Sequence, residues 1–113
     1  GDKKEVLHIQ EEIETQFTPQ TKKNLEQKWY NIKPVLGVAS GGVYPGIVPK
    51  MLKVMGNNIV IQAGGGVHGH PDGTIAGAKA MRQAIDAFMK KQSLKKYSEN
   101  QEELKRALEN WGE

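Results

Sequence analysis

The sequence predicts an α/β fold with a parallel sheet, of which this chain of 113 residues holds only a part. Two short, almost continuously apolar runs, residues 34–39 and 58–63, alternate with stretches whose apolar residues recur at helical spacing. Strands that alternate with helices form right-handed crossovers and hence a parallel sheet. Because two strands leave their edges unpaired and their apolar faces uncovered, we expect a segment of an α/β barrel or of an open α/β sheet.

The first predicted element is a helix over residues 3–16. Asp2 and, three residues later, Glu5 form a capping-box pattern at its start. Apolar residues then follow at helical spacing: Val6, Ile9, Ile13 and Phe17. Pro19 ends this pattern, because proline cannot continue a helix. Residues 20–33 are polar around two aromatic side chains, and we predict that they are mostly loop.

The next two predicted elements are a strand over residues 34–39 and a helix. Near-continuous apolarity over so few residues is typical of a parallel strand that is buried on both faces. Pro49 fits the start of the helix, where a missing N–H costs nothing, and Gly56 is a natural stop. The apolar face of this helix is formed by Met51, Leu52, Val54 and Met55.

A second strand, over residues 58–63, leads through a polar loop to two further helices. We expect Thr74 to cap the first of them, which ends near residue 91. Its apolar stripe is Ile75, Ala78, Met81, Ile85, Phe88 and Met89. Ser98 with Gln101 forms another capping-box pattern, which predicts the start of the last helix. The face of that helix is Leu104, Ala107, Leu108 and Trp111.

Composition and charge argue against several classes of protein. The formal net charge is +3, and basic and acidic residues are mixed along the chain rather than gathered in the basic stripe of a nucleic-acid binder. We interpret the densest basic group as a solvated surface near a helix C-terminus: Lys90, Lys91, Lys95 and Lys96. No apolar run approaches the roughly 20 residues of a membrane span. We therefore expect neither nucleic acid nor a membrane as a partner.

The chain has no cysteine. This excludes a disulfide framework and thiolate metal sites, and it is compatible with a cytoplasmic location. The first residue is Gly1 rather than methionine, so we expect a fragment or a processed product of a longer chain.

Both predicted strands end in glycine-rich loops that precede a helix, Ser40–Gly41–Gly42 and Gly64–Gly65–Gly66. In α/β folds, ligands bind at this end of the sheet. Glycine lets a phosphate approach the backbone and lets consecutive N–H groups point at it, and the hydroxyl of Ser40 can bond a sugar oxygen. The alternative is that the glycines only form tight turns. The sequence leaves both interpretations open.

His68 and His70 form a His-x-His pair in the loop after the second strand. Two imidazoles without further ligands are too few for a metal site, and Asp72 is the only carboxylate close to them in the sequence. We therefore interpret both histidines as loop residues with at most a structural hydrogen bond. We assign no catalytic or binding role to Tyr44. The sequence does not decide whether Trp111 lies in the core or at an interface.

At these residues the sequence resembles the large chain of ribulose bisphosphate carboxylase (RuBisCO). Val38–Gly42 is similar to the segment at the end of barrel strand seven, and Gln62–Gly66, followed by Gly69–Pro71, is similar to the segment after strand eight. Pro49 lies between the two motifs at matching spacing, and Gly1–Asp2 resembles the pair just after the mobile loop six. The likeness is in register over residues 1–90 and looser in the tail.

The resemblance implies the C-terminal part of a (β/α)8 TIM barrel, comprising its last two parallel strands with flanking helices, plus a C-terminal helix. Residues 1–92 would be the partial barrel segment and residues 93–113 the helical tail. The sequence departs from the plant-type pattern at Ala63, where phenylalanine is usual, and at His68, where leucine is common. These departures resemble an archaeal, form III enzyme.

The resemblance also implies roles for single residues. Three glycines would offer backbone N–H groups to one phosphate of ribulose 1,5-bisphosphate: Gly42, Gly64 and Gly65. Ser40 would bond a sugar hydroxyl, Gly41 would shape the turn, Gln62 would line the substrate, and His70 would be structural.

The implied activity is the addition of CO2 to ribulose 1,5-bisphosphate to give two 3-phosphoglycerates, used in the archaeal form for salvage of AMP and nucleosides. The lysine and carboxylates that hold Mg²⁺ would precede Gly1, so this segment would bind substrate, would hold no metal and would be inactive alone. Its partners would be the bisphosphate, the rest of the large chain and further copies of that chain. Two alternatives stay open: a RuBisCO-like sugar-phosphate enolase or isomerase, and a non-enzymatic phosphate-binding or assembly module.

Overall fold

The computed structural model describes residues 4, 17–18, 27–28 and 35–113. The predicted helix over residues 3–16 and the predicted loop over residues 20–33 therefore lie largely outside the described residues. Two short strands are described there, and β1 (Phe17–Thr18) pairs in antiparallel fashion with β2 (Gln27–Lys28). The second of these strands falls within the stretch that the sequence predicts to be mostly loop.

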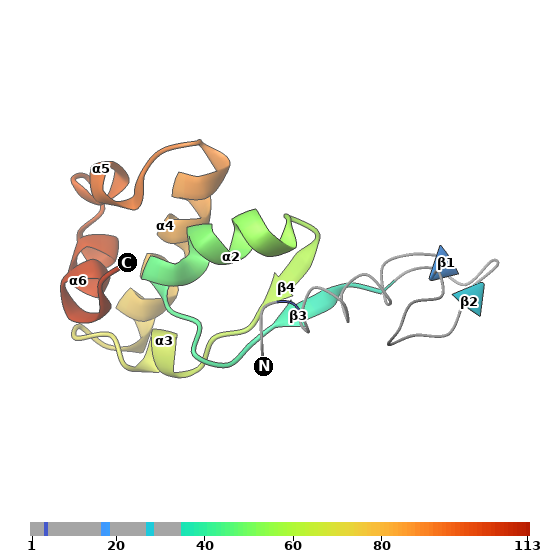
Figure 1. The fold of residues 1–113 in the computed structure, drawn as a ribbon. Helices are drawn as coiled ribbons and strands as arrows, with labels where there is room; N and C mark the ends of the chain where they lie inside the picture. The colour runs from blue at the N-terminus through green and yellow to red at the C-terminus, as the bar shows by residue number, and fades with distance from the viewer. Residues whose placement is uncertain (1–3, 5–16, 19–26, 29–34) are drawn as a thin grey trace.

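The rest of the chain alternates strands with helices and ends in helices (Figure 1). The elements in order are β3 (Gly37–Ala39), η1 (Pro45–Ile47), α2 (Val48–Met55), β4 (Ile59–Ile61), α3 (Gly65–His68), α4 (Thr74–Met89), α5 (Leu94–Ser98) and α6 (Glu102–Trp111). The two predicted strands and the helices that follow them are thus confirmed, with both strands shorter than predicted. The 3-10 helix η1 and the single turn α3 are additions that the sequence pattern does not predict.

β3 and β4 form a two-stranded parallel sheet, as the alternation of strands and helices predicts. The register pairs Gly37 with Ile59, Val38 with Val60, and Ala39 with Ile61. Because side chains alternate along a strand, Ala39 is buried while Val38 and Val60 are 53% and 43% exposed. Ile59 and Ile61 pack against the hydrophobic core on the other face. Within the described residues, the sheet is therefore covered on one face and open on the face of the two valines.

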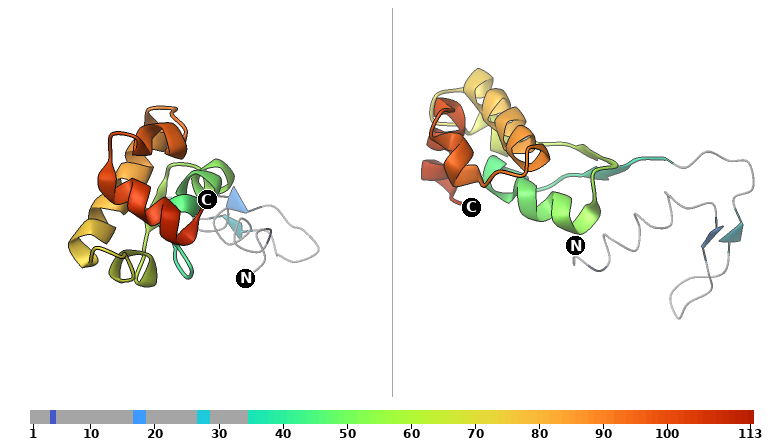
Figure 2. Two further views of the ribbon diagram at one scale, coloured as in Figure 1. Left: turned by 90° about the vertical axis from the view of Figure 1, so that its left-hand side faces the viewer. Right: turned by 90° about the horizontal axis from the view of Figure 1, so that it is seen from above.

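The core lies around α4, which packs against α2, α3, α5, α6 and η1 (Figure 2). The buried face of α4 includes small residues that allow this close approach: Gly77, Ala80, Ala84 and Ala87. A side chain at position 77 would collide with the backbone carbonyl of Val67 in α3. The fully buried side chains of Leu104 and Val48 fill the space on either side of α4. None of the described helices has the length and apolarity needed to cross a membrane.

The predicted cap of α4 is displaced by one residue. The N-cap is Gly73, whose φ of 96° lies in the left-handed region that favours glycine. Thr74 is the first helical residue, and its hydroxyl oxygen lies 3.1 Å from Nδ1 of His68. The prediction that Thr74 caps the helix is therefore wrong, because its side chain contacts the preceding loop instead of the first turn.

The predicted capping box at Ser98 and Gln101 is also wrong. Ser98 is the last residue of α5, and its hydroxyl donates to the carbonyl of Lys95 at 2.7 Å. Gln101 is the N-cap of α6 but makes no capping hydrogen bond with its side chain. Ser93 caps α5, because its Oγ accepts the backbone N–H of Lys96 at 3.2 Å. The tail is thus two helices with a break, where the sequence predicts one.

Candidate functional site

The two glycine loops leave the sheet side by side. Gln62, the first residue after β4, donates its backbone N–H to the carbonyl of Ala39, the last residue of β3, at 2.9 Å. The residues that the sequence predicts to bind substrate are all exposed: Ser40, Gly41, Gly42, Gln62, Gly64 and Gly65. The structure therefore brings the two predicted sets together at the carboxyl end of a parallel sheet, where α/β folds bind ligands.

Gly41 and Gly42 are required by the shape of the first loop. Their φ angles are 83° and 68°, and such positive values strain any residue with a side chain. The shape of the turn therefore accounts for both glycines, and their role in binding substrate stays a prediction. Such a turn still leaves side-chain-free backbone exposed beside Ser40, which is compatible with a ligand close to the loop.

Gly65, in contrast, is required neither by backbone conformation nor by packing within the described residues. Its φ is not positive, and a Cβ atom built on Gly65 or on Gly64 meets no atom within 4 Å. Gly65 is the first residue of the short helix α3. The N–H groups that begin a helix have no acceptor inside it. The fold thus leaves an open stretch of bare backbone with N–H groups to donate.

The two loops touch each other next to this stretch. A side chain at Gly66 would collide with the backbone carbonyl of Val43 and crowd the Cα of Tyr44. Gly66 is buried, whereas Gly64 and Gly65 are exposed. The third glycine of the run therefore fixes the loops against each other, and the first two form the exposed surface.

One hollow lies beside the first loop, and another lies on the far side of α2, toward the end of α4. A hollow of about 360 Å³ opens beside the first loop, lined by Ser40, Gly41 and Gly42 on one side and by residues of α2 that include Lys50 and Met51 on the other. Lys50 is thus a cation close to the candidate site.

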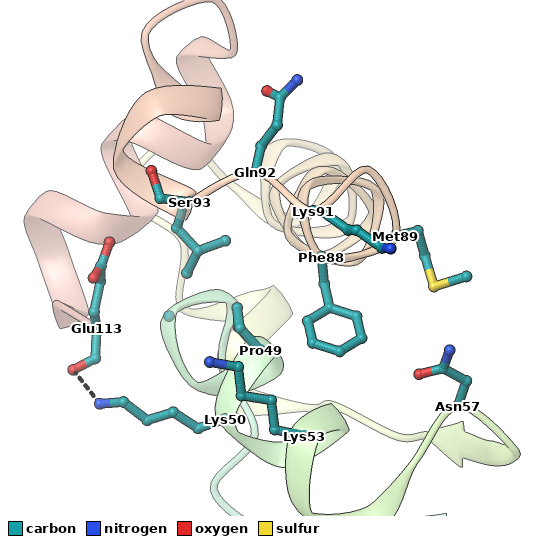
Figure 3. Close-up of a pocket in the computed structure, with 12 residues that line it drawn as sticks. Pro49, Lys50, Lys53, Asn57, Phe88, Met89, Lys91, Gln92, Ser93 and Glu113 are labelled. Atoms are coloured by element: carbon teal, nitrogen blue, oxygen red, sulfur yellow. Dashed lines mark hydrogen bonds between the residues drawn. The ribbon is translucent and has the colours of Figure 1, made fainter.

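A larger hollow, of about 830 Å³, lies between α2 and the end of α4 (Figure 3). Lys53, Lys91 and Phe88 are among its lining residues, and Nζ of Lys50 donates to the carbonyl of Glu113 at 3.3 Å across it. It contains none of the predicted site residues. We place the candidate site at the glycine loops rather than in this larger hollow. The exposed backbone of the loops can offer N–H groups to a phosphate, and the glycines that provide it do not line the hollow.

His70 is a structural residue, as the sequence predicts. Its side chain is buried, with 4% exposed, and Nδ1 accepts the backbone N–H of Asp72 at 3.0 Å. Nε2 lies 2.8 Å from the carbonyl of Glu103, which can only accept, so Nε2 carries the proton. Both ring nitrogens are engaged, and the ring has no nitrogen left for a ligand. The described residues bring no three His, Cys, Asp or Glu side chains together as a metal site.

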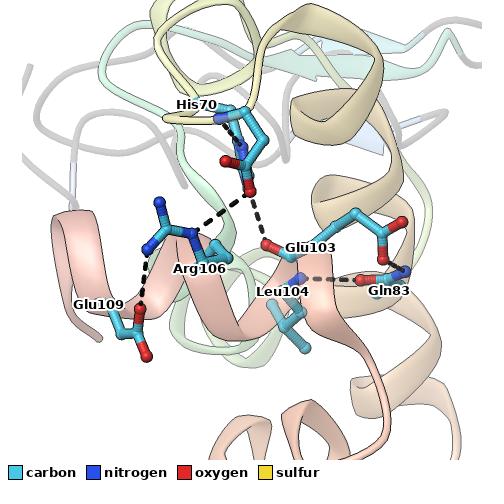
Figure 4. Close-up of polar contacts among 7 residues, drawn as sticks. His70, Gln83, Glu103, Leu104, Arg106 and Glu109 are labelled. Carbon is cyan, nitrogen blue, oxygen red and sulfur yellow. Dashed lines mark hydrogen bonds and ion pairs between the residues drawn. The ribbon is translucent and has the colours of Figure 1, made fainter.

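Polar contacts attach α6 to α4 and to the loop after β4 (Figure 4). Oε1 of Gln83 accepts the backbone N–H of Leu104, and Nε2 of Gln83 donates to the Glu103 carboxylate, both at 2.9 Å. The bond from Gln83, with one from the backbone N–H of Glu103 itself, lowers the pKa of Glu103. Nε of Arg106 donates to Oδ2 of Asp72 at 3.3 Å, and this bond raises the pKa of the guanidinium.

Two aromatic residues to which the sequence analysis assigns no role lie against these loops. The ring centroids of Tyr44 and Trp111 are 6.4 Å apart, and those of His70 and Trp111 are 6.3 Å apart in an edge-on arrangement. The only signal in the sequence is the place of Trp111 at the end of an apolar helical stripe. Nothing local indicates which residues that stripe meets.

Comparison with known proteins agrees with this geometry. The sequence model of the family described as "Ribulose bisphosphate carboxylase large chain, catalytic domain" matches residues 1–111. The ribulose bisphosphate carboxylase of Methanocaldococcus jannaschii is 51% identical over 113 residues, which are 98% of this chain and 27% of the relative. The chain therefore spans about a quarter of the length of that relative.

Solved structures give the same result. A dimeric archaeal Rubisco from Hyperthermus butylicus superposes with a TM-score of 0.89 at 50% identity, covering 96% of this chain and 26% of that one. A rubisco-like protein from Alicyclobacillus acidocaldarius superposes with a TM-score of 0.70 at 41% identity, covering 73% and 21%. The chain therefore belongs to the ribulose bisphosphate carboxylase large-chain family, in its archaeal type, and corresponds to a C-terminal segment of that large chain.

Proposed function

We propose that this segment forms one phosphate-binding rim of a ribulose bisphosphate carboxylase, which adds CO2 to ribulose 1,5-bisphosphate and yields two 3-phosphoglycerates. In this proposal the backbone N–H groups of Gly42, Gly64 and Gly65 bind one phosphate. Ser40 bonds a sugar hydroxyl, Gly41 shapes the turn, and Gln62 lines the substrate. The segment binds and aligns the substrate, which lowers the barrier of a reaction carried out by groups elsewhere.

The observation that carries the proposal is the open backbone at Gly65. Within the described residues, neither a positive φ nor a neighbouring atom calls for glycine there. A phosphate accounts for it, because phosphate oxygens accept hydrogen bonds from consecutive backbone N–H groups that no side chain shields. The adjacent parallel strands support the proposal further, since they bring the second glycine loop to the same end of the sheet.

Magnesium has no place among the described residues in this proposal. Mg²⁺ takes carboxylate oxygens and water as ligands, and the described residues bring no three candidate ligands together. The residues present thus do not fit the ion, and we assign its ligands to the rest of the large chain. The open valine face of β3 and β4 supports the same division, because the remaining strands of a (β/α)8 barrel would cover it.

Assembly belongs to the whole large chain. The Hyperthermus butylicus relative is described as dimeric, and we propose that the large chain carrying this segment is likewise a homo-oligomer. Its proposed location is the cytoplasm, and its proposed ligand is the bisphosphate.

The test uses a hybrid large chain, in which this chain replaces the matched segment of the 51%-identical relative. Gly65→Val puts a branched side chain where the phosphate approaches, so the KM for ribulose 1,5-bisphosphate rises. The loss of one charge-assisted hydrogen bond corresponds to roughly 1.5–3 kcal/mol, or about ten- to a hundredfold in affinity. kcat falls as well if alignment is lost. Steady-state kinetics at saturating CO2 measure both constants.

Two control variants separate binding from folding. Ala78→Val adds a branched side chain at an exposed position of α4, and His68→Ala removes an exposed ring from the second loop. Both leave KM unchanged. The Gly65→Val hybrid must melt at the temperature of the unsubstituted hybrid, which we expect because no atom of the described residues lies within 4 Å of the new Cβ. Unaltered bisphosphate kinetics in a folded Gly65→Val hybrid would refute the phosphate assignment.

The relationship to a rubisco-like protein supports a second candidate, a sugar-phosphate enolase or isomerase with the same phosphate rim. The complete large chain that carries this segment distinguishes the two. Incorporation of labelled CO2 into 3-phosphoglycerate is expected for the carboxylase. Exchange of a substrate proton with solvent without CO2 incorporation indicates the enolase or isomerase.

A further inference from the structure

Trp111, the last residue of α6, lies between the two glycine loops. Its ring faces Tyr44, in the loop after β3, with ring planes 36° apart, and meets His70, in the loop after β4, with ring planes 68° apart. A Cβ atom placed on Gly69 would lie 3.3 Å from Cζ2 of Trp111. One side chain of the tail therefore contacts both loops on which the candidate site is built.

The residue after Trp111 makes a second contact, with η1, which follows the first loop. Gly46 in η1 lies so close to the carbonyl of Gly112 that any side chain at position 46 would collide with it. The backbone of Gly112 is held in turn by a hydrogen bond from its N–H to the carbonyl of Leu108 at 2.8 Å. Its φ of 79° lies in the left-handed region that favours glycine. The end of α6 is thus fixed against η1 by backbone packing as well as by the ring.

The other end of α6 is fixed to the second loop by polar contacts. His70 donates to the carbonyl of Glu103 at 2.8 Å, and Arg106 donates to Asp72 at 3.3 Å (Figure 4). The first bond is part-buried and involves the buried side chain of His70, so its loss leaves a buried ring N–H without a partner. The second joins two half-exposed side chains and contributes little. α6 is therefore attached to the β4 loop at its start and to both loops at its end.

These contacts lie next to the bare backbone of the site. Tyr44 follows the Gly41–Gly42 turn, and its Cα is packed against Gly66, the neighbour of Gly65. His70 and Gly69 close the same short segment that begins with Gly64. Because phosphate N–H donors must hold their positions to about an ångström to align a substrate, whatever holds Tyr44 and His70 together also holds the donors.

We propose that Trp111 is a positioning residue that clamps the two glycine loops at the separation needed to bind one phosphate. The inference rests on the proposed function of those loops. It gives the helical tail a role in substrate affinity, in addition to covering the core. Trp111 acts through Tyr44 and His70 and does not touch the substrate.

The test compares Trp111→Ala and Trp111→Phe in the hybrid large chain. Trp111→Ala raises the KM for ribulose 1,5-bisphosphate roughly ten- to a hundredfold, because the N–H donors of the two loops no longer match one phosphate and hydrogen bonds to it are lost. kcat stays within about threefold of the parent, because the groups that carry out the reaction lie elsewhere in the large chain. The inhibition constant of inorganic phosphate, which depends on phosphate contacts and on no sugar contact, rises with KM. Trp111→Phe keeps a ring between the loops and returns both constants to within about threefold of the parent.

A merely structural role for Trp111 predicts a different outcome. Leu108→Ala removes a side chain of α6 that packs against the hydrophobic core, so it lowers the melting temperature and leaves KM and phosphate inhibition unchanged. If Trp111→Ala behaves in the same way, the clamp is refuted while the phosphate site stands.

Tyr44→Leu removes the ring partner from the loop side and reproduces the rise in KM, which keeps the test decisive if Trp111→Ala fails to fold. Unchanged KM in Tyr44→Leu then counts against the clamp. Failure of the proposed function is recognised separately, since Gly65→Val would then leave the bisphosphate kinetics unaltered.

Discussion

Among the residues that the structure describes, the helical side is closed, whereas the strand side is open. Leu104 is completely buried between α6 and α4, and the polar groups at the start of α6 have partners on α4. Val38 and Val60, paired across the two strands, are about half exposed. The candidate site lies where the two sides meet. The comparison indicates that the helices hold the loops in shape, while a complete binding site needs protein on the strand side as well.

The largest effect is expected on the closed side, from Leu104→Ala. The change leaves a cavity in a site with no exposure, so the hybrid large chain loses about 2–5 kcal/mol of free energy of unfolding. Ile75→Ala, at a side chain that is 77% exposed, is the matched control and changes stability by less than about 0.5 kcal/mol. Urea titration followed by circular dichroism measures both. Equal effects of the two substitutions would remove the distinction between the closed and exposed surfaces.

The open side is tested by its tendency to associate. We expect the isolated chain to self-associate, because within the part of the chain that the structure describes β3 and β4 have an uncovered apolar face and unpaired edges. Val38→Asp together with Val60→Asp removes about 0.8 kcal/mol of apolar burial per half-exposed valine, which weakens association roughly tenfold. In the hybrid large chain, where other strands cover this face, the same pair lowers the free energy of unfolding.

Sedimentation velocity of the isolated chain checks this prediction. A parent chain that remains a dilute monomer and melts cooperatively would contradict it. Ile75→Asp with Met89→Asp, at two exposed positions of α4, is the control and leaves association unchanged.

The smallest effect is expected from the pH dependence of the contact between α6 and α4. The fold lowers the pKa of Glu103 below its ordinary value of 4.5, chiefly through the hydrogen bond from Gln83. The unfolded chain therefore binds the proton more readily, and the stabilisation is complete above the ordinary pKa and is lost as the pH falls through the lowered pKa. Glu103→Gln removes this contribution. The urea midpoints of the parent hybrid and of the Glu103→Gln hybrid are measured from pH 6 down to pH 3, and we expect them to converge as the pH falls. If the difference between the two midpoints does not change with pH, the ionised carboxylate contributes nothing to stability.

The sequence predicts the elements of both sides well and their ends poorly. β3, β4, α2 and α4 follow from apolar runs and helical spacing, which are local properties of the chain. The start of α6 does not, because the N–H of Leu104 is bonded by Gln83 from another helix rather than by a nearby cap. Ser98, which the sequence predicts as a cap, is the last residue of α5, whereas Ser93, which the sequence does not single out, caps that helix.

The candidate site shows the same limit. The glycine motifs after the strands are readable in the sequence, and so is their meeting at one end of a parallel sheet. The sequence does not show why glycine stands at each position. Position 41 has a positive φ, position 66 has no room for a side chain beside the neighbouring backbone, and neither reason applies at position 65. The contact of Trp111 with both loops also depends on how the tail packs. Whether the six predicted residues bind substrate stays a prediction, for which Gly65→Val is the test.

The contact between Gly66 and the backbone at Val43 and Tyr44 has a consequence for engineering. A library that varies the sequence of one glycine loop must also consider the other loop, because the backbones of the two loops pack against each other. Grafting either loop alone from a distant relative would bring a backbone path made for a different counterpart. The natural unit of exchange is both loops together with the end of α6 that lies across them.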